Sequence, residues 1–388
     1  MRATRLQATR WIRATRAGSR RGITVGLAVL LLAATAGSAT AGSGTAGESA
    51  ETGAGVASPT AGAQGRFTVD RDDTYEIAQL TGPGSINRTD EKWQVGGTDL
   101  GSMFMHKGQL VSVFGDTFAK AFTDDWRSNA IAFSRDADPS DGITYDRMIT
   151  DRPGHAKELI DQSAVPGEEV TIIPTYGTSV DGRMYLHYMA VRQWQEPGNW
   201  ALNQSGMAYS DDDGQTWTVS DLTWPADSNF GQVAMVPKGD QIYLFGIPGG
   251  RFGGVQVARV AKDKLLDASA YRYWDGTTWG TDIAAAKTIV PGPVGELSVQ
   301  WNTHYDTWIM AYLNDDDSTN AVVLRTASEL TGSWSDEQVV VTSEEAPALY
   351  APYLPPRWNA GPDIYFALSQ FGPYNVFWWH TSLDVAAS

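Results

Sequence analysis

Two aspartates, Asp99 and Asp116, lie near the ends of a segment, Gly97–Phe118, that has the pattern of a β-hairpin. Two-residue loops containing glycine are common hairpin connections, and Lys107-Gly108 fits that description. Counting outward from this loop places Asp99 directly opposite Asp116, where Cβ atoms are only about 4.5–5.5 Å apart. Two like charges at this range destabilise a sheet, so the pair calls for a function. Carboxyl groups with different pKa values are suited to acid and base catalysis at a glycosidic bond.

The hairpin belongs to a strand pattern that occurs five times in the chain. In each copy a turn leads into an aromatic-rich strand, and a second apolar strand follows. The copies are spaced by about 55 to 75 residues, and several antiparallel strands per copy are typical of a β-propeller. We therefore expect an all-β fold, a five-bladed β-propeller, with a β-sandwich as the alternative. The aromatic strands start at Gly108, Gly182, Asp240, Asp306 and Pro362.

Asp116 differs from its counterparts in the other four copies. When the aromatic strands are aligned on their apolar cores, neutral residues take its place elsewhere. A position that is charged once in five copies is a functional candidate, although an acid there could also cap a turn or pair with a nearby arginine. Gly115, directly before it, could form a β-bulge that redirects the side chain. The neutral counterparts are Met189, Ile247, Leu313 and Ser369.

The same architecture predicts where several further acidic and histidine residues lie. Glu296 begins the expected inner strand of the fourth copy and could face the central channel with the two aspartates, or it could be an ordinary strand-end glutamate. His106 sits at the turn end of its hairpin, away from the expected site, and His187 lies mid-strand as a core histidine. Asp315–Asp317 is expected to be a solvated loop. No histidine cluster or carboxylate run has the spacing of a metal site, so neither a metal nor a cofactor is expected.

Two local patterns concern structure rather than chemistry. Ser210–Trp217 fits the Asp-box, S-x-D-x-G-x-T-W, a hairpin turn that decorates propeller blades in sialidases and many other proteins. Its acids are expected to satisfy backbone groups of the turn, so it supports a propeller and says little about a reaction. Lys262–Ala270 is the best candidate for a short helix.

Residues 1–41 have the pattern of an export signal. Seven arginines and no acid precede a short apolar run, Gly22–Thr35, and Ala39-Thr40-Ala41 is a small-residue cleavage site. Ser19-Arg20-Arg21 hints at the twin-arginine route, with ordinary secretion as an equal alternative. A retained membrane anchor is less favoured because the apolar run is short. The protein is therefore expected to be secreted or associated with the cell wall.

The rest of the chain divides into a linker and one large domain. Residues 42–65 are rich in Gly, Ala, Ser and Thr and are expected to be a flexible linker, so residues 66–388 would form the propeller catalytic domain. Loss of the signal's seven arginines changes the formal charge from −16 to −23, which disfavours nucleic acid and anionic membranes as partners. The chain has no cysteine, which excludes disulfides, thiolate metal sites, a cysteine nucleophile and a lipoprotein anchor. We expect a monomer.

From about Ile77 to its end, the chain resembles the bacterial family catalogued as domain of unknown function 4185, which is grouped as glycoside hydrolase family 183. Members occur in actinobacteria and their phages. The segments that carry the resemblance are TDLGSMFMHKGQLVSVFGDTF, GNWALNQSGMAYSDDDGQTW, GQVAMVPKGDQIYLFGIPGGRFGGVQVARV, GELSVQWNTHYDTWIMAYL, and PYLPPRW with FGPYNVFWW.

The resemblance implies a five-bladed propeller with endo-D-arabinofuranosidase activity. Its substrates would be the D-arabinan of mycobacterial arabinogalactan and lipoarabinomannan, cleaved with inversion. Asp99 and Asp116 match the family's catalytic pair, and by analogy with other five-bladed glycosidases Asp99 would be the base and Asp116 the acid. Glu296 could tune either pKa or replace one of them. The alternatives are a non-catalytic propeller that binds wall glycan and, less favoured because no F-R-I-P segment is present, a sialidase-like hydrolase.

Seven further residues in these segments are candidates for binding arabinan. Each lies near an expected strand end or in a loop between blades, where it could reach a glycan or simply pack. Tryptophan and tyrosine can stack on sugar faces, while Asn, Gln and Arg can bond to hydroxyl groups. The candidates are Trp200, Asn203, Gln232, Arg251, Trp301, Asn302 and Tyr374.

Overall fold

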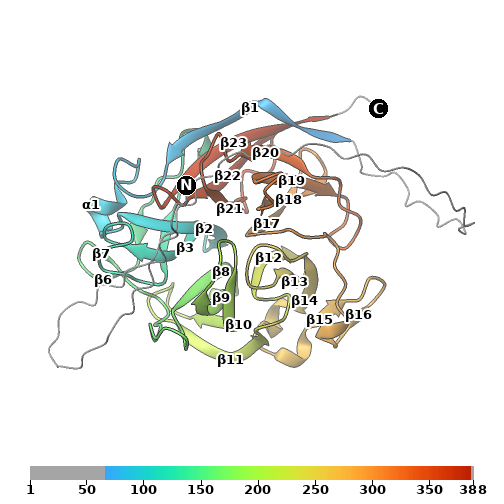
Figure 1. The fold of residues 1–388 in the computed structure, drawn as a ribbon, viewed down its shortest axis with the longest axis horizontal. Helices are drawn as coiled ribbons and strands as arrows, with labels where there is room; N and C mark the ends of the chain where they lie inside the picture. The colour runs from blue at the N-terminus through green and yellow to red at the C-terminus, as the bar shows by residue number, and fades with distance from the viewer. Residues whose placement is uncertain (1–65, 386–388) are drawn as a thin grey trace, which may run out of the picture.

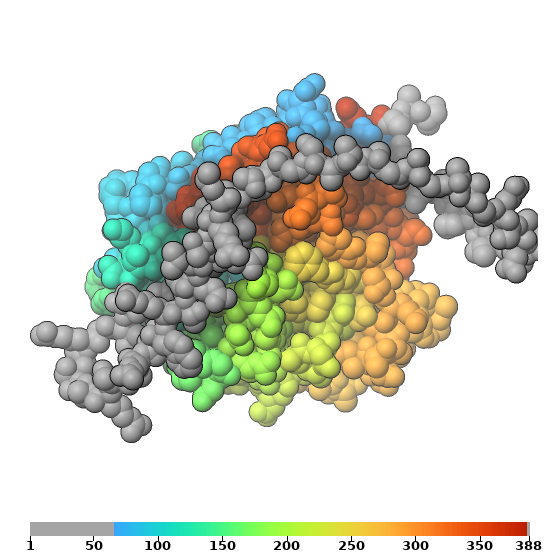
Figure 2. Space-filling view, viewed as in Figure 1, coloured from blue at the N-terminus to red at the C-terminus, as the bar shows by residue number. Residues whose placement is uncertain are grey.

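A computed structural model describes residues 66–385 of the protein. Five antiparallel sheets are arranged around a central axis, which confirms the five-bladed β-propeller (Figure 1). The predicted signal peptide and linker fall on residues 1–65 and so lie outside the described residues. Neighbouring blades pack directly against one another around the ring (Figure 2). Within residues 66–385, every helix is too short or too polar to cross a membrane.

The blades follow one another along the chain, and each runs from an inner to an outer strand. Blade 1 contains β2 (Gly97–His106), β3 (Gln109–Phe118), β4 (Ala130–Ser134) and β5 (Arg147–Met148). Blade 2 contains β8 (Thr171–Val180), β9 (Arg183–Trp194), β10 (Trp200–Ser210) and β11 (Thr218–Pro225). Blade 3 contains β12 (Gln232–Lys238), β13 (Gln241–Ile247), β14 (Gln256–Ala261), β15 (Arg272–Trp274) and β16 (Trp279–Gly280).

Blades 4 and 5 complete the ring. Blade 4 contains β17 (Leu297–Asn302), β18 (Thr307–Asn314), β19 (Ala321–Ala327) and β20 (Gln338–Thr342). Blade 5 contains β21 (Leu349–Tyr353), β22 (Asp363–Gln370) and β23 (Asn375–Val385), and its outer strand is β1 (Phe67–Gln79) from the start of the described chain. Outside the blades lie α1 (Thr89–Trp93) and a small sheet of β6 (Thr150–Arg152) and β7 (His155–Ala156).

The innermost strands β2, β8, β12, β17 and β21 surround the centre, and each contacts its neighbours in the ring. Their side chains are buried at nearly every position. They are packed on both faces, and their polar side chains, such as Ser298 and Thr175, are buried with the apolar ones. The five aromatic strands predicted from the repeat are the second strands β3, β9, β13, β18 and β22, so the repeat analysis is confirmed at every blade.

The predicted helix at Lys262–Ala270 is wrong. The segment forms two separate 3₁₀ turns, Lys262–Lys264 and Ala268–Ala270. Between them, the Asp267 carboxylate accepts a hydrogen bond from the Ser269 amide at 3.0 Å. A side chain that bonds to nearby backbone in this way competes with helix formation, and so it divides the segment.

The Asp-box is structural, as predicted. Asp212 accepts hydrogen bonds from the Thr216 amide at 2.8 Å and from the Ser210 hydroxyl at 2.8 Å. Asp213 reaches the neighbouring blade, where its carboxylate bonds to Nε2 of His106 at 2.8 Å and pairs with Lys107. The turn therefore ties blade 2 to the turn end of the β2–β3 hairpin.

Candidate active site

The β2–β3 hairpin has the predicted register at its turn, where His106 pairs with Gln109. Near the open end the register shifts, so that two residues of β3, Gly115 and Asp116, face the single residue Asp99 of β2. This arrangement is a β-bulge. The bulge predicted at Gly115 is confirmed, whereas the regular one-to-one pairing of the two aspartates is wrong.

Gly115 makes room for the Asp99 carboxyl group. A Cβ atom built at Gly115 would collide with Oδ1 of Asp99, so only glycine lets that carboxyl lie against the backbone of β3. Leu100, directly after Asp99, has a φ of 66°, a conformation that costs a non-glycine residue about 1–2 kcal/mol. Local strain of this kind concentrates at functional sites.

Asp99 is buried between two tyrosine donors and two other acids, whose effects on its pKa oppose one another. The Tyr350 hydroxyl donates a hydrogen bond to Oδ2 at 3.0 Å, and the Tyr374 hydroxyl also approaches the carboxyl. Oδ1 is buried and has no hydrogen-bond partner among the described residues. Burial, together with the charges of Asp116 and Glu296, raises the pKa of Asp99 to about 8, against the opposing effect of the two tyrosines. Asp99 is therefore expected to hold its proton at neutral pH.

Asp116 lies in a more polar setting. Its Oδ1 accepts hydrogen bonds from Nε1 of Trp126 at 2.9 Å and from the Thr171 hydroxyl at 2.6 Å. Burial raises the pKa of Asp116 to about 6, and these two donors limit the rise because they stabilise the carboxylate. Asp116 is thus expected to be the more readily ionised of the two aspartates. The order of the two pKa values favours Asp99 as acid and Asp116 as base, the reverse of the assignment made by analogy.

Glu296 lies at the same centre but is already paired. Its side chain is 5% exposed, and Oε1 accepts hydrogen bonds from Nη2 and Nε of Arg251 at 2.9 and 3.2 Å. The Arg251 guanidinium also lies 3.7 Å from Asp315 and 4.9 Å from the centre of the Tyr350 ring. Burial alone would lower the pKa of Arg251, but the Glu296 and Asp315 carboxylates raise it. Glu296 therefore acts as the partner of Arg251, which in turn contacts the tyrosine bonded to Asp99.

Asp315 departs from the solvated loop predicted for Asp315–Asp317. Asp316 and Asp317 are exposed, as expected, but the Asp315 side chain is only 24% exposed and faces Arg251. Burial raises the pKa of Asp315, and the guanidinium opposes that rise.

Asp99 and Glu296 occupy equivalent positions in different blades. In each of the four other blades, the neutral counterpart of Asp116 on the second strand pairs with one residue near the start of the inner strand. That residue is the counterpart of Asp99, and in blade 4 it is Glu296. These positions form a ring at one level of the channel. Its members are Asp99, Ile173, Gln232, Glu296 and Tyr350.

Four of the seven predicted binding residues lie at this ring: Gln232 belongs to it, and Tyr374, Arg251 and Trp200 lie around it. Tyr374 approaches Asp99, and Arg251 pairs with Glu296, as described above. Gln232 donates to the backbone oxygens of Gly250 at 2.9 Å and Pro248 at 3.3 Å, so it holds the loop that carries Arg251. The Trp200 ring is 5.8 Å from the Arg251 guanidinium.

The other three binding candidates lie away from the carboxyl groups. Trp301 is at the far end of β17, about 16 Å along the strand from Glu296, and packs against Trp308 at 5.2 Å. Asn302 caps the following turn, where its side-chain oxygen accepts from the His304 amide at 2.9 Å. Asn203 is exposed on β10 and donates to the Glu168 backbone.

The two histidines lie where the sequence predicted. His187 is fully buried, its Nδ1 bonds to the Thr175 hydroxyl at 2.7 Å, and burial lowers its pKa to about 3. His106 is buried at the turn end of the hairpin. Among residues 66–385, no group of three or more acidic or histidine side chains could hold a metal ion.

Three residues that contact the aspartates were missed from the sequence: Tyr350, Trp126 and Thr171. Tyr350 could have been found by aligning the inner strands of the repeat as well as the second strands, since it is the blade 5 counterpart of Asp99. Trp126 lies in the loop between β3 and β4, outside the strands that the repeat aligns. Its role depends on a tertiary contact that the sequence does not signal.

A family model described as a domain of unknown function, DUF4185, matches residues 84–380. The chain belongs to the DUF4185 family. Two fungal proteins are similar to it: Notoamide biosynthesis cluster protein J of Aspergillus sp. (strain MF297-2) is 30% identical over 313 residues, which are 74% of this chain and 83% of the fungal one. Protein J' of the corresponding cluster in Aspergillus versicolor is 30% identical over 299 residues, 72% of this chain and 81% of its own. Relatives of this DUF4185 protein therefore extend beyond actinobacteria and their phages.

Among solved structures, a Bacteroides ovatus protein described as a candidate hydrolase aligns with a TM-score of 0.56 and 14% identity, over 81% of this chain and 93% of its own. At that identity the likeness shows a shared fold alone. A GH43_1 enzyme from Xanthomonas citri aligns with a TM-score of 0.45 and 14% identity, over 81% of the DUF4185 chain and 90% of its own. That TM-score is too low to carry an argument.

Proposed function

We propose that this DUF4185 protein is a glycoside hydrolase in which Asp99 is the general acid and Asp116 the general base. One observation carries the proposal: two carboxyl groups meet at the bulged open end of the β2–β3 hairpin in different surroundings, Asp116 with two side-chain donors on Oδ1 and Asp99 with a buried Oδ1 that has no partner among the described residues. Burial raises the pKa of both, and the charge of Asp116 raises that of Asp99 further. Two acids with separated pKa values are what glycoside hydrolysis needs, because one must give a proton while the other takes one.

The reaction follows from the free atoms of each carboxyl group. Protonated Asp99 gives its hydrogen to the glycosidic oxygen as the bond to the anomeric carbon breaks. Oδ2 of Asp116, the oxygen not bonded to Trp126 and Thr171, takes a proton from water as the water oxygen attacks that carbon. The products are a free reducing end and a released alcohol, and proton exchange with solvent resets both acids. The nearby carboxylates favour the oxocarbenium character of the transition state.

D-Arabinan is the substrate that the family resemblance supports. We propose endo-acting cleavage of D-arabinofuranosyl linkages in arabinogalactan and lipoarabinomannan, by a protein exported through its N-terminal signal to the outside of the cell. The argument is that the matched family covers the segments that carry both aspartates, Arg251 and Tyr374.

The decisive experiment incubates the purified protein with mycobacterial arabinogalactan and analyses released oligo-arabinosides by mass spectrometry. Release by the native protein, and none by Asp116→Asn, supports the proposal. Binding to arabinan without release would instead indicate a glycan-binding propeller. Hydrolysis of a fluorogenic sialoside would indicate the sialidase alternative, which is disfavoured because Arg251 is already paired with two carboxylates.

Inversion is tested by the anomer that is released first. In a regular hairpin the two carboxyl groups would be near the ~5–5.5 Å typical of retaining enzymes, and the bulge at Gly115 relaxes that constraint toward the ~6.5–9.5 Å of inverting ones. Proton NMR of the first product should show an anomer opposite to that of the substrate. The same anomer would indicate a covalent intermediate on Asp116 instead.

A further inference from the structure

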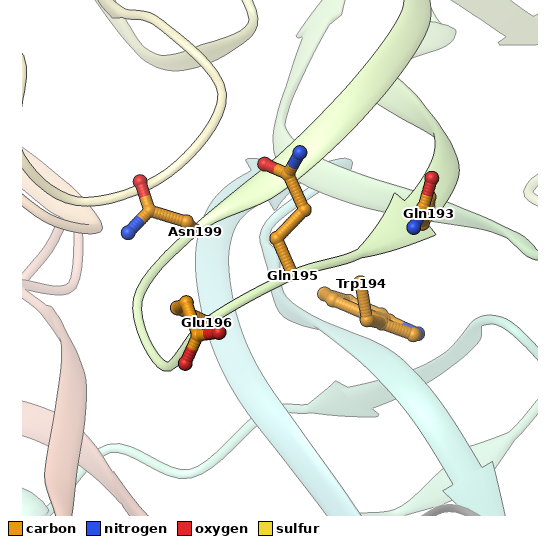
Figure 3. Close-up of a pocket in the computed structure, with 5 residues that line it drawn as sticks. All are labelled: Gln193, Trp194, Gln195, Glu196 and Asn199. Carbon is orange, nitrogen blue, oxygen red and sulfur yellow. The ribbon is translucent and has the colours of Figure 1, made fainter. Parts of the chain in front are cut away.

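A second set of polar and aromatic side chains lies at the end of β9 and on the loop that follows it to β10, on the same face as the candidate active site. An open hollow there is lined by Gln193, Trp194, Gln195, Glu196 and Asn199 (Figure 3). All five are exposed, and their side chains spread around the loop instead of packing together. No part of the proposed reaction uses them.

The side chains of the hollow have the chemistry of a sugar-binding surface. Trp194 is 36% exposed, and its ring meets Trp200 in a T-shaped contact at 5.8 Å, which orients it without stacking a second ring on it. Around it lie amides and a carboxylate, which donate to and accept from hydroxyl groups. A flat apolar ring with polar groups at its margin suits a sugar, which has apolar C–H faces and a rim of hydroxyls. Glu196 disfavours anionic polymers.

The loop is held in one shape. The Gln195 amide donates to Asn199 O at 3.1 Å, and the Asn199 amide donates to Glu196 O at 2.9 Å. Gly198 has a φ of 75°, and a Cβ there would lie 2.8 Å from Asp315 and 3.0 Å from the Phe252 ring. A loop fixed this closely presents its side chains without a large ordering cost on binding.

The hollow is linked to the active site by backbone and side-chain contacts. The Arg251 amide donates to Gly198 O at 2.9 Å, so the loop that supplies the Glu296 partner is bonded to the loop of the hollow. From Trp194 the contacts run through Trp200 to the Arg251 guanidinium. On the same blade, β9 pairs Val191 with Thr171, the donor to Asp116, and then continues three residues farther to Trp194. The hollow therefore lies on the same face as the two aspartates, about 16 Å along β9 from Met189, the blade 2 counterpart of Asp116.

We infer that this hollow is a remote glycan-binding subsite, with Trp194 as its stacking platform, for a neutral polysaccharide whose scissile bond lies at Asp99 and Asp116. A polysaccharide that reaches from the hollow to the two aspartates places an internal linkage, not a terminal sugar, at the active site. This binding mode favours endo-cleavage of long polysaccharides over removal of terminal sugars. The inference rests on the proposed function for the identity of the polymer.

The test compares long and short substrates in the full protein. Trp194→Ala is assayed on D-arabinan polymer and on the shortest arabino-oligosaccharide that the native protein cleaves. Loss of one stacking contact should lower kcat/KM on the polymer by about fivefold to tenfold and leave the short substrate unchanged. Trp194→Phe, which keeps a ring, should recover most of the loss. Tyr75→Ala is the matched control, because Tyr75 is 51% exposed on β1, the outer strand of blade 5.

Each outcome is decisive. Equal losses on both substrates, or none on the polymer, would overturn the subsite while leaving the proposed activity in place. If the native protein releases no oligosaccharide, the proposed activity fails, and affinity electrophoresis in gels that contain D-arabinan then decides the subsite. Stronger retardation of the native protein than of Trp194→Ala supports it, and equal mobility overturns it.

Discussion

The β2–β3 hairpin meets carboxyl groups at both of its ends, and the two ends treat them differently. At the turn, Asp213 of the Asp-box bonds to His106 and pairs with Lys107, and these contacts lower its pKa. At the open end, burial and neighbouring acids raise the pKa of Asp99 and Asp116. At the turn end, Asp213 is fully paired, and its contacts join blade 2 to blade 1. At the open end, the charges of Asp99 and Asp116 are not fully compensated, and a carboxyl group in that condition exchanges protons near neutral pH.

The largest expected effect is on kcat, which should fall when an aspartate at the open end is replaced and not when Asp213 at the turn end is replaced. Asp116→Asn should lower kcat on arabinan by about 10²–10⁴-fold, the usual contribution of a general base, whereas Asp213→Asn should leave kcat within about twofold. Asp99→Asn should be equally damaging on arabinan but should retain activity on an aryl arabinofuranoside with a good leaving group, which needs no acid. Asp116→Asn should be inactive on both. Retention by Asp116→Asn instead would restore the assignment of Asp99 as base.

A glycine at each end offers the next contrast. Gly115→Ala should lower kcat by more than tenfold, because its Cβ collides with the Asp99 carboxyl. Gly108→Ala at the turn has open space for a Cβ but a φ of 78°, so it should cost about 1–2 kcal/mol of unfolding free energy and no activity. Urea unfolding and initial rates measure the two effects. Full activity in Gly115→Ala would show that the Asp99 carboxyl has freedom to move.

The pH profile gives a smaller but more specific effect. Activity should rise as pH passes about 6, where Asp116 loses its proton, and fall as it passes about 8, where Asp99 loses its own. Tyr350→Phe removes a donor that stabilises ionised Asp99, so the pKa of Asp99 should rise and the alkaline limb of kcat/KM should move to higher pH. A move to lower pH, or a loss of activity with an unchanged profile, would contradict this role of Tyr350.

The smallest effect concerns stability. The pKa of Asp99 is raised on folding, so stability from this group falls as pH rises from about 4, the unfolded value, to about 8. Asp99→Asn removes that penalty and should raise the melting temperature at pH 8 by a few degrees, with a smaller gain at pH 5. Asp213, with a lowered pKa, is the reverse case, and Asp213→Asn should lower the melting temperature. Scanning calorimetry at the two pH values compares them.

Features that depend on a local sequence pattern or on the fivefold repeat could be predicted from the sequence. The five aromatic strands recur with their turns, so blade number and the second and third strands could be read directly. The hairpin count placed Asp99 and Asp116 together, and Gly115 indicated the bulge. These features depend on residues within one blade.

Contacts between blades were harder to predict. Tyr350 bonds to Asp99 across 251 residues of sequence, and Arg251 and Glu296 meet from blade 3 and the start of blade 4. The pKa order follows from that shared environment and not from residue type, so the assignment of acid and base made by analogy could not take it into account. Trp301 and Asn302 lie on β17, which begins directly after Glu296. Because a strand rises about 3.3 Å per residue, they lie at the opposite end of the channel from Glu296.

The pairing of β1 with β23 has a consequence for when the protein becomes active. The outer strand of blade 5 comes from the start of the described chain, and its inner strand supplies the hydroxyl bonded to Asp99. Until the last blade is in place, Asp99 lacks the contacts with Tyr350 and Tyr374 that blade 5 supplies, so its surroundings are incomplete. Contacts between the two ends of a chain form late because they carry the largest loop-closure cost. Catalytic competence should therefore appear in one step with ring closure, and an incomplete chain should be inert toward the glycan it is built to cut.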